Sequence, residues 1–495
     1  MTEDQIASSK LLIGKEWVEA EGGRTFVRND PYTGEAVTRA AAASLSDVQR
    51  IVEAAEEGFA AWSATPPRER AAALMAIAQQ LVNRSDELAQ MALEETGAPL
   101  AGGHLMVGMA VENLRWAATQ VHALEGRTIP SSKPDRLSFT VREPVGAVLV
   151  MAPWNGAIFQ IVRSMVMPLA LGNSVVLRGS ELAPRCHAAV ARACLSAGLP
   201  AGVVGYLTND PADAPAAVES LIASQAIQAV SFTGSDRVGS IVASQAGAHF
   251  KKVVLELGDT SPVVVLADAN VDAAVTAVAI GGFGFSGQGC IATERVLADS
   301  AISREFSEKL VAAVAGMKTG DPRDPATQLP PLINEAAVDR VEGLVQDAVE
   351  AGATLLCGGT REGRCFPATV LTGVTPSMRI FQEETFGPVV TVTEASGPED
   401  ALRLANDSSY GLCSSIFTGD VELGLSLARR VRSGMCHING MTLDDEAPVP
   451  FGGVKRSGTG RHGLEGALDV FSEVKWITVE VPGGPQGALF GVPLG

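Results

Sequence analysis

Cysteine is scarce in this chain of 495 residues, and the few cysteines present are scattered. They stand at positions 186, 194, 290, 357, 365, 413 and 436, and no two of them form a Cys-x-x-Cys pair. The spacing therefore indicates neither a zinc site nor a disulfide framework, and we expect no metal. Unpaired thiols are typical of a reducing compartment, so we expect a cytoplasmic protein.

Positive charge is also in short supply. The chain has 38 lysines and arginines against 56 aspartates and glutamates, a formal net charge of −18. Such an acidic surface argues against nucleic acid or an anionic membrane as the main partner. No apolar run is long enough to span a membrane, and the first residues lack the basic and apolar regions of a secretory signal.

The overall composition, with 46% hydrophobic and 19% charged residues, is typical of a globular protein. The length exceeds what one ordinary core accommodates, so we expect two or three domains. Short strands and turns are indicated for residues 10–42. Helices are predicted for residues 46–64, 66–94 and 103–124, with Ser46 as a possible N-cap of the first.

Strand and helix patterns alternate from about residue 145 onward. The predicted strands are 145–151, 174–178, 203–207, 228–233, 253–257, 262–266, 353–357 and 388–393. Helices are expected to begin near Leu182, Asp213, Asp236 and Val271, and to span 302–316 and 334–351. This rhythm predicts an α/β fold with a doubly wound parallel sheet. Residues 136–144 are predicted to form an exposed strand, and residues 475–481 the final strand of the chain.

A glycine-rich stretch, residues 281–295, surrounds Cys290. Glycine adopts backbone conformations that other residues avoid, and it lets other groups approach the main chain. A thiol on such a turn is accessible, and a nucleophilic cysteine needs access and a favourable local field. Taken alone, Cys290 also fits a small residue buried in a core.

Asn155 follows the predicted strand 145–151, at the point where a helix is expected to begin. Ligands of parallel sheets collect at the carboxyl ends of strands, and a carboxamide there can donate a hydrogen bond to a developing oxyanion. The alternative is that Asn155 caps the helix.

Two further segments follow predicted strands in the same way. Arg178 and Glu181 can bind ribose hydroxyls, and the charge of Glu181 would repel a 2′-phosphate, which favours NAD over NADP; the alternative is a surface ion pair. In residues 232–239 a strand runs through a glycine turn into a helix whose first N–H groups can bind a pyrophosphate. That spacing differs from Gly-x-Gly-x-x-Gly, and it also fits a purely structural turn.

A carboxylate, Glu256, stands in the apolar strand 253–257. Burying its charge is costly, and burial raises the pKa of a carboxyl toward neutrality, as a general base requires. Gly258 would admit a ligand or water beside it. The alternative is a buried glutamate satisfied by backbone donors.

Six motifs occur in an order that resembles the aldehyde dehydrogenase superfamily. They are Pro153-Trp154-Asn155, Phe232-Thr-Gly-Ser235, Glu256-Leu-Gly258 with Ser261-Pro262, Gly287-Gln-Gly-Cys290, Glu383-Glu-Thr-Phe-Gly-Pro388 and Pro450-Phe-Gly-Gly-Val-Lys455-Arg-Ser-Gly458. The resemblance runs from about residue 10 to residue 481. It implies a Rossmann-like NAD domain, an α/β catalytic domain and a small β oligomerisation element.

The resemblance also implies roles for the matching residues. Cys290 is implied as the nucleophile, Glu256 as the general base, and Asn155 with the Cys290 backbone N–H as the oxyanion hole. The positions that match cofactor-binding residues are Trp154, Arg178, Glu181, Gly234, Ser235, Gly239, Leu257, Glu384 and Phe386. The implied reaction oxidises a small aldehyde to the carboxylic acid through a cysteine thiohemiacetal and thioester. The implied cofactor is NAD, with NADP as the alternative.

The domain boundaries follow from the same resemblance. Residues 1–125 and 145–254 are expected to form the NAD-binding domain, and 255–447 the catalytic domain. Residues 126–144 and 468–482 would form the oligomerisation element of a homodimer or homotetramer. Residues 483–495, rich in glycine and proline, are expected to lie outside the core.

Several positions depart from the family pattern. Arg178 and Gly179 stand where lysine and proline are common, Asp259 where glycine is usual, and Phe285 where asparagine is frequent. The loop 209–215 lacks the glycines that often lie near the adenine. These departures concern the geometry of cofactor binding and leave the reaction type unchanged.

Residues 435–453 resemble the branch of the family that oxidises benzaldehyde, vanillin or salicylaldehyde. The candidate substrate residues are Phe159, Arg163 and Phe451, because a flat apolar slot with one polar group suits a substituted aromatic ring. The alternative places Phe159 in the core and Arg163 in a structural ion pair, with an aliphatic aldehyde or a semialdehyde as substrate.

Two other classes of function stay open. An acylating enzyme would pass the thioester to coenzyme A, but Glu256 argues for hydrolysis, which needs a base. A non-catalytic scaffold on the same fold is disfavoured because Cys290, Glu256 and Asn155 are all present.

Overall fold

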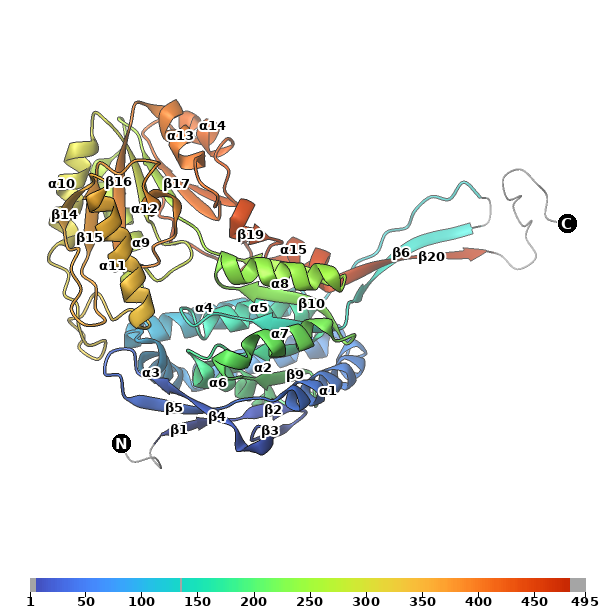
Figure 1. The fold of residues 1–495 in the computed structure, drawn as a ribbon. Helices are drawn as coiled ribbons and strands as arrows, with labels where there is room; N and C mark the ends of the chain where they lie inside the picture. Colours follow the sequence, from blue (N-terminus) through green and yellow to red (C-terminus); the bar gives the residue numbers. More distant parts are fainter. Residues whose placement is uncertain (1–5, 134–135, 481–495) are drawn as a thin grey trace.

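The computed structural model describes residues 6–133 and 136–480, which form two α/β lobes and a long two-stranded arm (Figure 1). All seven cysteines are free thiols. Within the described residues, no helix has both the length and the apolar character needed to cross a membrane. The predicted tail 483–495 lies outside these residues.

The first lobe is built on an eight-stranded sheet. Its order is β19 (Gly458–Thr459), β11 (Lys252–Glu256), β10 (Ile227–Thr233), β7 (Ala147–Met151), β8 (Ser174–Arg178), β9 (Val204–Leu207), β2 (Leu11–Ile13) and β3 (Glu16–Val18). The run from β11 to β9 is parallel, whereas β19, β2 and β3 add antiparallel edges. The inner strands are largely apolar because helices cover both of their faces.

Those helices lie in two cores. One face packs against α5 (Phe159–Ala170) and α6 (Pro184–Ser196), with α2 (Pro67–Asn83), α3 (Ser85–Thr96), α4 (Leu100–Thr119) and α15 (Leu464–Phe471) in the same core. The other face packs against α1 (Leu45–Ser63), α7 (Ala214–Ala223) and α8 (Asp236–Ala248). A small sheet of β1 (Ala7–Ser9), β5 (Ala36–Ala41) and β4 (Thr25–Asn29) lies beside them.

The second lobe has a seven-stranded sheet. Its order is β14 (Thr354–Cys357), β15 (Thr369–Thr372), β16 (Val389–Ala395), β13 (Arg295–Asp299), β12 (Pro262–Val265), β17 (Cys413–Phe417) and β18 (Met435–Ile438). Only β14 runs antiparallel to its neighbour. The covering helices are α9 (Val271–Phe283) and α10 (Ser303–Val314) in one core, and α11 (Glu335–Glu350), α12 (Arg379–Gln382), α13 (Pro398–Asn406) and α14 (Val421–Ala428) in the other.

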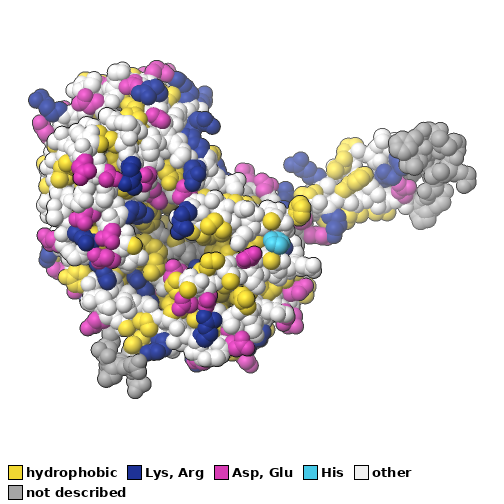
Figure 2. Space-filling model, in the orientation of Figure 1, with side chains coloured by type: hydrophobic (Ala, Val, Ile, Leu, Met, Phe, Trp, Pro, Cys, Tyr) yellow, Lys and Arg dark blue, Asp and Glu magenta, His cyan; other side chains and the backbone are white. Residues whose placement is uncertain are grey.

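The arm pairs β6 (Arg136–Pro144) with β20 (Ser472–Glu480) over nine residue pairs and projects from the first lobe (Figure 1). Four apolar side chains along it, Leu137, Val474, Trp476 and Val479, are each more than half exposed. Figure 2 shows apolar side chains along this arm, while acidic and basic side chains are interspersed over the visible face of the lobes.

Three local predictions were wrong. The predicted helix 66–94 is two helices, because Arg84 leaves the helical conformation and its N–H turns back to the carbonyls of Leu81 and Val82. Ser44, and not Ser46, caps α1, because Ser44 and Asp47 form a reciprocal capping box. The helix after Asn155 begins only at Phe159.

The parallel order brings the predicted site segments to one edge. The neighbouring strands β11, β10, β7 and β8 end at Glu256, Thr233, Met151 and Arg178. Since the carboxyl ends of parallel strands share an edge, the segments that follow them are neighbours in space. The fold therefore assembles in one place what the sequence separates.

Close packing of α1 on the first sheet yields a stability prediction. A Cβ on Gly58 would lie 2.2 Å from the carbonyl carbon of Gly202, so Gly58→Ala forces two backbones apart. We expect it to lower the free energy of unfolding by about 1–3 kcal/mol. Gly108→Ala, in an exposed turn of α4 with open space around it, should raise the free energy by up to about 1 kcal/mol. Urea unfolding of both variants checks this, and equal effects would contradict it.

Candidate active site

A cavity of about 330 Å³ opens at the carboxyl edge of the first sheet, facing the second lobe. Eight of the predicted site residues line it: Trp154, Asn155, Gly234, Ser235, Glu256, Cys290, Glu384 and Phe386. Two segments of the second lobe, 333–340 and 384–386, complete its wall. A thiol, a carboxylate and a carboxamide from distant parts of the chain thus face one space.

Asn155 does not cap the helix. The residue before α5 is Ile158, which has no side-chain cap, and Asn155 lies in the turn between β7 and α5. Its Nδ2 donates to the backbone carbonyl of Gln288 at 2.9 Å, two residues before Cys290. This bond fixes the carboxamide beside the thiol-bearing turn, where its second N–H can donate to an oxygen on a bound carbonyl.

Glu256 ends β11 and is 3% exposed. Neither of its carboxylate oxygens has a hydrogen-bond partner, which excludes the alternative of a glutamate satisfied by backbone donors. Burial raises the pKa of this carboxyl well above its usual range, against the opposing charges of Arg163 and Arg461. A carboxyl with a raised pKa is a stronger base than an exposed carboxylate, as a general base requires.

Cys290 follows a tight turn that is held open by unusual backbone conformations. Phe285, Ser286 and Gly287 have φ angles of 51°, 54° and 69°. A Cβ on Gly287 would lie 2.1 Å from the carbonyl oxygen of Gly387, so only glycine allows this approach. Cys290 is partly exposed at the cavity, while burial and then the charge of Glu256 raise the pKa of its thiol to about 12.

The turn from β10 into α8 is suited to a dinucleotide phosphate. Ser235 caps α8, and its Oγ accepts from the N–H of Val238 at 3.4 Å. Thr233 Oγ1 is buried at the cavity wall without a hydrogen-bond partner. A helix N-terminus and an unpaired hydroxyl are donors that a pyrophosphate can use, so the residues present fit a nicotinamide dinucleotide.

Four predicted cofactor residues lie outside the lining of this cavity. Arg178 and Glu181 approach each other at 3.5 Å, and Arg178 Nε also donates to Asn209 Oδ1 at 3.0 Å. Leu257 packs against Gly239, where a Cβ would lie 2.5 Å from Leu257 Cδ2. Gly239 therefore lets α8 pack closely on the segment that follows β11.

The three candidate substrate residues form a buried cluster. Arg163 lies 3.7 Å over the ring of Phe451 and 5.3 Å over that of Phe159. It also forms a two-pronged ion pair with Asp445, at 2.8 and 3.1 Å. The ion pair that the sequence left as an alternative is therefore present, and its partner Asp445 was not anticipated.

Two residues of the cavity wall were not predicted from the sequence. Gln160 in α5 and Arg340 in α11 line the cavity, and Arg340 donates to the carbonyl of Thr385 at 3.0 Å. Both lie on helices, where an isolated polar residue is as easily interpreted as a surface position as a site residue. Only the spacing of Gln160 from Asn155 offered any signal.

Two departures from the family pattern have a structural explanation. Phe285 packs against Trp154, with ring centroids 6.2 Å apart, and Trp154 in turn meets Phe386 edge-on at 6.0 Å. Asp259 is buried and accepts from the N–H of Cys413 at 2.9 Å and from Ser261 Oγ at 3.0 Å. The extra aromatic ring and the extra carboxylate are thus both part of the packing around the site.

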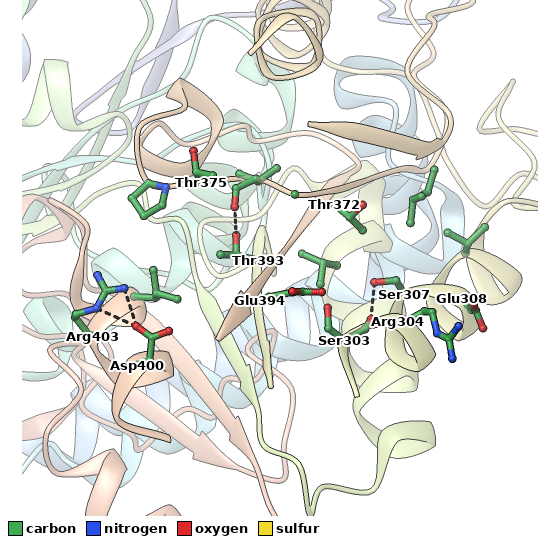
Figure 3. A pocket seen from close by; sticks show the side chains of 17 residues that line it. Ser303, Arg304, Ser307, Glu308, Thr372, Thr375, Thr393, Glu394, Asp400 and Arg403 are labelled. Atoms are coloured by element: carbon green, nitrogen blue, oxygen red, sulfur yellow. Dashed lines mark hydrogen bonds and ion pairs between the residues drawn. The ribbon is translucent and has the colours of Figure 1, made fainter. Parts of the chain in front are cut away.

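A larger cavity, of about 990 Å³, lies in the second lobe between α10, β16 and α13 (Figure 3). Some of its polar side chains bond within its own wall: Ser307 Oγ donates to the Ser303 carbonyl and Thr393 Oγ1 to the Val374 carbonyl, each at 2.8 Å. Arg403 pairs with Asp400. None of the predicted site residues lines it, so size alone does not identify the active site.

The chain is similar to known proteins over nearly its whole length. The model of the aldehyde dehydrogenase family matches residues 17–477. A vanillin dehydrogenase from Pseudomonas fluorescens is 44% identical over 95% of this chain and 97% of its own length. An NAD⁺-dependent benzaldehyde dehydrogenase from Pseudomonas putida is 39% identical over 97% and 98%. The crystal structure of a salicylaldehyde dehydrogenase from Pseudomonas putida G7, complexed with salicylaldehyde, has a TM-score of 0.95 at 38% identity and covers 98% of this chain and all of its own.

The raised pKa of Cys290 predicts its reactivity toward alkylation. Because the thiolate is the reactive form, we expect the rate of alkylation by iodoacetamide to rise without a plateau from about pH 7 to about pH 10. Glu256→Gln removes a charge that opposes thiolate formation, so it should displace the profile to lower pH. Mass spectrometry of the Cys290 peptide checks both, with Cys357 as an internal control whose rate should not differ between variants. A plateau near the pKa of a free thiol would contradict the prediction.

Proposed function

The chain belongs to the aldehyde dehydrogenase family, and on that premise we propose that it oxidises aromatic aldehydes to carboxylic acids. Its enzyme class is that of an NAD(P)-dependent oxidoreductase acting on the aldehyde group of small molecules. The proposal rests on an apolar cluster of Ile291, Leu412, Cys413 and Phe451, against which Cys290 packs. A flat apolar ring would gain most from such surroundings, and similar proteins are named for vanillin, benzaldehyde and salicylaldehyde.

Carbon–sulfur bond formation begins the proposed mechanism. Glu256 takes the proton of the Cys290 thiol, and the sulfur adds to the aldehyde carbon. The resulting oxyanion accepts hydrogen bonds from Asn155 Nδ2 and the Cys290 backbone N–H. A nicotinamide held at the cavity wall beside Trp154, Glu384 and Phe386 would supply the acceptor for the hydride of that carbon. Collapse of the oxyanion as the hydride departs leaves a thioester on Cys290.

Hydrolysis completes the cycle. After releasing the thiol proton to solvent, Glu256 takes a proton from water, whose oxygen attacks the thioester carbon. The Cys290 sulfur leaves as a thiolate, the carboxylic acid forms, and Glu256 returns a proton to the thiolate. The unpaired carboxylate oxygens of Glu256 are free to bind this water. A base that is buried without partners supports hydrolysis over transfer to coenzyme A.

We assign the cofactor to the cavity wall and propose NAD as the preferred form. Gly234 and Ser235 would hold the pyrophosphate, and Glu384 and Phe386 the nicotinamide ribose, beside Trp154. Arg178 and Glu181 would contact the adenine-side ribose. The carboxylate of Glu181 disfavours a 2′-phosphate, while its 3.5 Å separation from Arg178 leaves that arginine only partly neutralised.

We further propose that the arm mediates a homodimer or a homotetramer. Its apolar residues Leu137, Val474, Trp476 and Val479 are each more than half exposed on a two-stranded ribbon. Apolar surface of this kind is characteristic of an interaction site.

Two substitutions test the assigned roles. Cys290→Ala should abolish NADH formation without unfolding the chain. Glu256→Gln should slow hydrolysis more than thioester formation, so that a burst of NADH precedes a steady rate lowered at least about a hundredfold. Stopped-flow absorbance checks this, with circular dichroism as the control for folding. Full activity of Cys290→Ala would eliminate the mechanism, and restoration of turnover by coenzyme A would indicate an acylating enzyme.

A substrate panel tests the specificity. Benzaldehyde, vanillin and salicylaldehyde should exceed acetaldehyde in kcat/KM by about ten- to a hundredfold, because the aromatic ring buries more apolar surface. Succinate semialdehyde should be poor, because Arg163 is already neutralised by Asp445. Running the panel with NAD and NADP side by side measures the cofactor preference. A higher kcat/KM for the aliphatic aldehydes would overturn the aromatic assignment.

A further inference from the structure

Glu294 is a buried carboxylate to which the proposed mechanism gives no role. It lies four residues after Cys290, directly before β13, and is 3% exposed. Its backbone carbonyl accepts from the N–H of Thr391 at 2.9 Å and from Thr391 Oγ1 at 3.1 Å. The main chain of Glu294 is therefore fixed to the start of β16.

The side chain of Glu294 binds the segment that carries two proposed ribose contacts. The N–H of Thr385 donates to Oε1 and Oε2 at 3.0 and 2.9 Å, and the N–H of Phe386 donates to Oε1 at 2.8 Å. Phe386 has a φ of 47°, a conformation that a non-glycine residue adopts only when its surroundings hold it there. The carboxylate supplies that hold, since these bonds form only when the turn takes this shape.

The turn places Glu384 and Phe386, which flank Thr385, in the cavity wall. Glu384 Oε1 accepts from the N–H of Asp259 at 3.2 Å, which is the one hydrogen bond that the structure gives to its carboxylate. The remaining acceptor positions of Glu384 are available for a ligand. A displaced turn would move both side chains together.

The same turn is also joined to the Cys290 turn. Gly287 approaches the carbonyl of Gly387 so closely that no side chain fits between them. The turn before Cys290 contacts residues 385–387, and Glu294, just after Cys290, binds the same residues. Nucleophile and ribose contacts are held as one unit.

The carboxyl groups of Glu294 and Glu384 also interact electrostatically. Burial raises the pKa of both, and the charge of Glu294 raises the pKa of Glu384 further. The other charged or titratable groups that face the pair are Arg340 from α11, Arg295 from β13, Asp259, Tyr410 and Cys290. Arg340 favours ionisation of both carboxyls, whereas Asp259 disfavours it at Glu384.

We propose that Glu294 is a positioning residue for the nicotinamide nucleotide, because its carboxylate shapes the 385–386 turn that brings Glu384 and Phe386 to the cavity. This inference rests on the proposed role of Glu384 and Phe386 in binding the ribose. An ionised Glu384 accepts the stronger hydrogen bonds from ribose hydroxyls. Affinity for NAD⁺ therefore rises with pH as Glu384 loses its proton.

Isothermal titration calorimetry with NAD⁺, over about pH 6 to about pH 9, tests the proposal through binding. Glu294→Gln keeps the shape but removes the charge and one acceptor. We expect it to weaken NAD⁺ binding about tenfold at the high-pH limit. It should also move the pH midpoint of the affinity about one unit toward acid. In the steady state KM for NAD⁺ should rise more than kcat falls.

The controls separate this inference from the proposed function. Glu383→Gln removes the same charge from an exposed neighbour that pairs with Arg379, and it should leave both affinity and midpoint unchanged. Glu294→Asp should restore the midpoint while leaving the affinity low. If Glu384→Gln does not affect NAD⁺ binding, the proposed ribose site is wrong. If Glu384→Gln weakens binding but Glu294→Gln has an unshifted midpoint, the positioning role alone is overturned.

Discussion

The antiparallel pairing of β19 with β11 is the constraint on which the site depends. The N–H of Leu257 donates to the carbonyl of Ser457 at 3.0 Å, and Gly458 lies so close to β11 that a Cβ would be 1.8 Å from the Leu255 carbonyl oxygen. Through this pairing, the chain returns from the second lobe to the strand that ends in Glu256. The carboxylate is thereby bounded by both lobes, and its burial there raises the pKa of the carboxyl.

Local pattern was sufficient to predict the central strands of the first lobe and the segments that follow them. The strand 174–178 was predicted to the residue, because a buried parallel strand is a continuous apolar run between turn residues. Family resemblance added the order of the motifs. Helix boundaries were less predictable: the break at Arg84 depends on the conformation of one residue, and the cap at Ser44 on a reciprocal bond with Asp47.

The long-range partners of buried acidic side chains could not be predicted from the sequence. Arg163 and Asp445 stand 282 residues apart, and Glu294 and Thr385 stand 91 apart. The sequence around each of these acidic residues does not distinguish it from the others among the 56 aspartates and glutamates of the chain. What distinguishes them is burial, and burial is decided by how helices and loops from both lobes meet. The catalytic trio could be proposed because motifs mark it, whereas its supporting charges carry no motif.

The two-stranded arm has a consequence for how the protein is made. Arg136 and Glu480, which meet at its far end, are 344 residues apart in sequence. During synthesis β6 emerges long before its partner, with exposed edges and with Leu137 open to water. The ribbon can therefore close only after β20 has been synthesised, and its pairing is among the most long-range in the chain. An assembly contact that needs both strands of this ribbon could accordingly be made only by chains synthesised through β20.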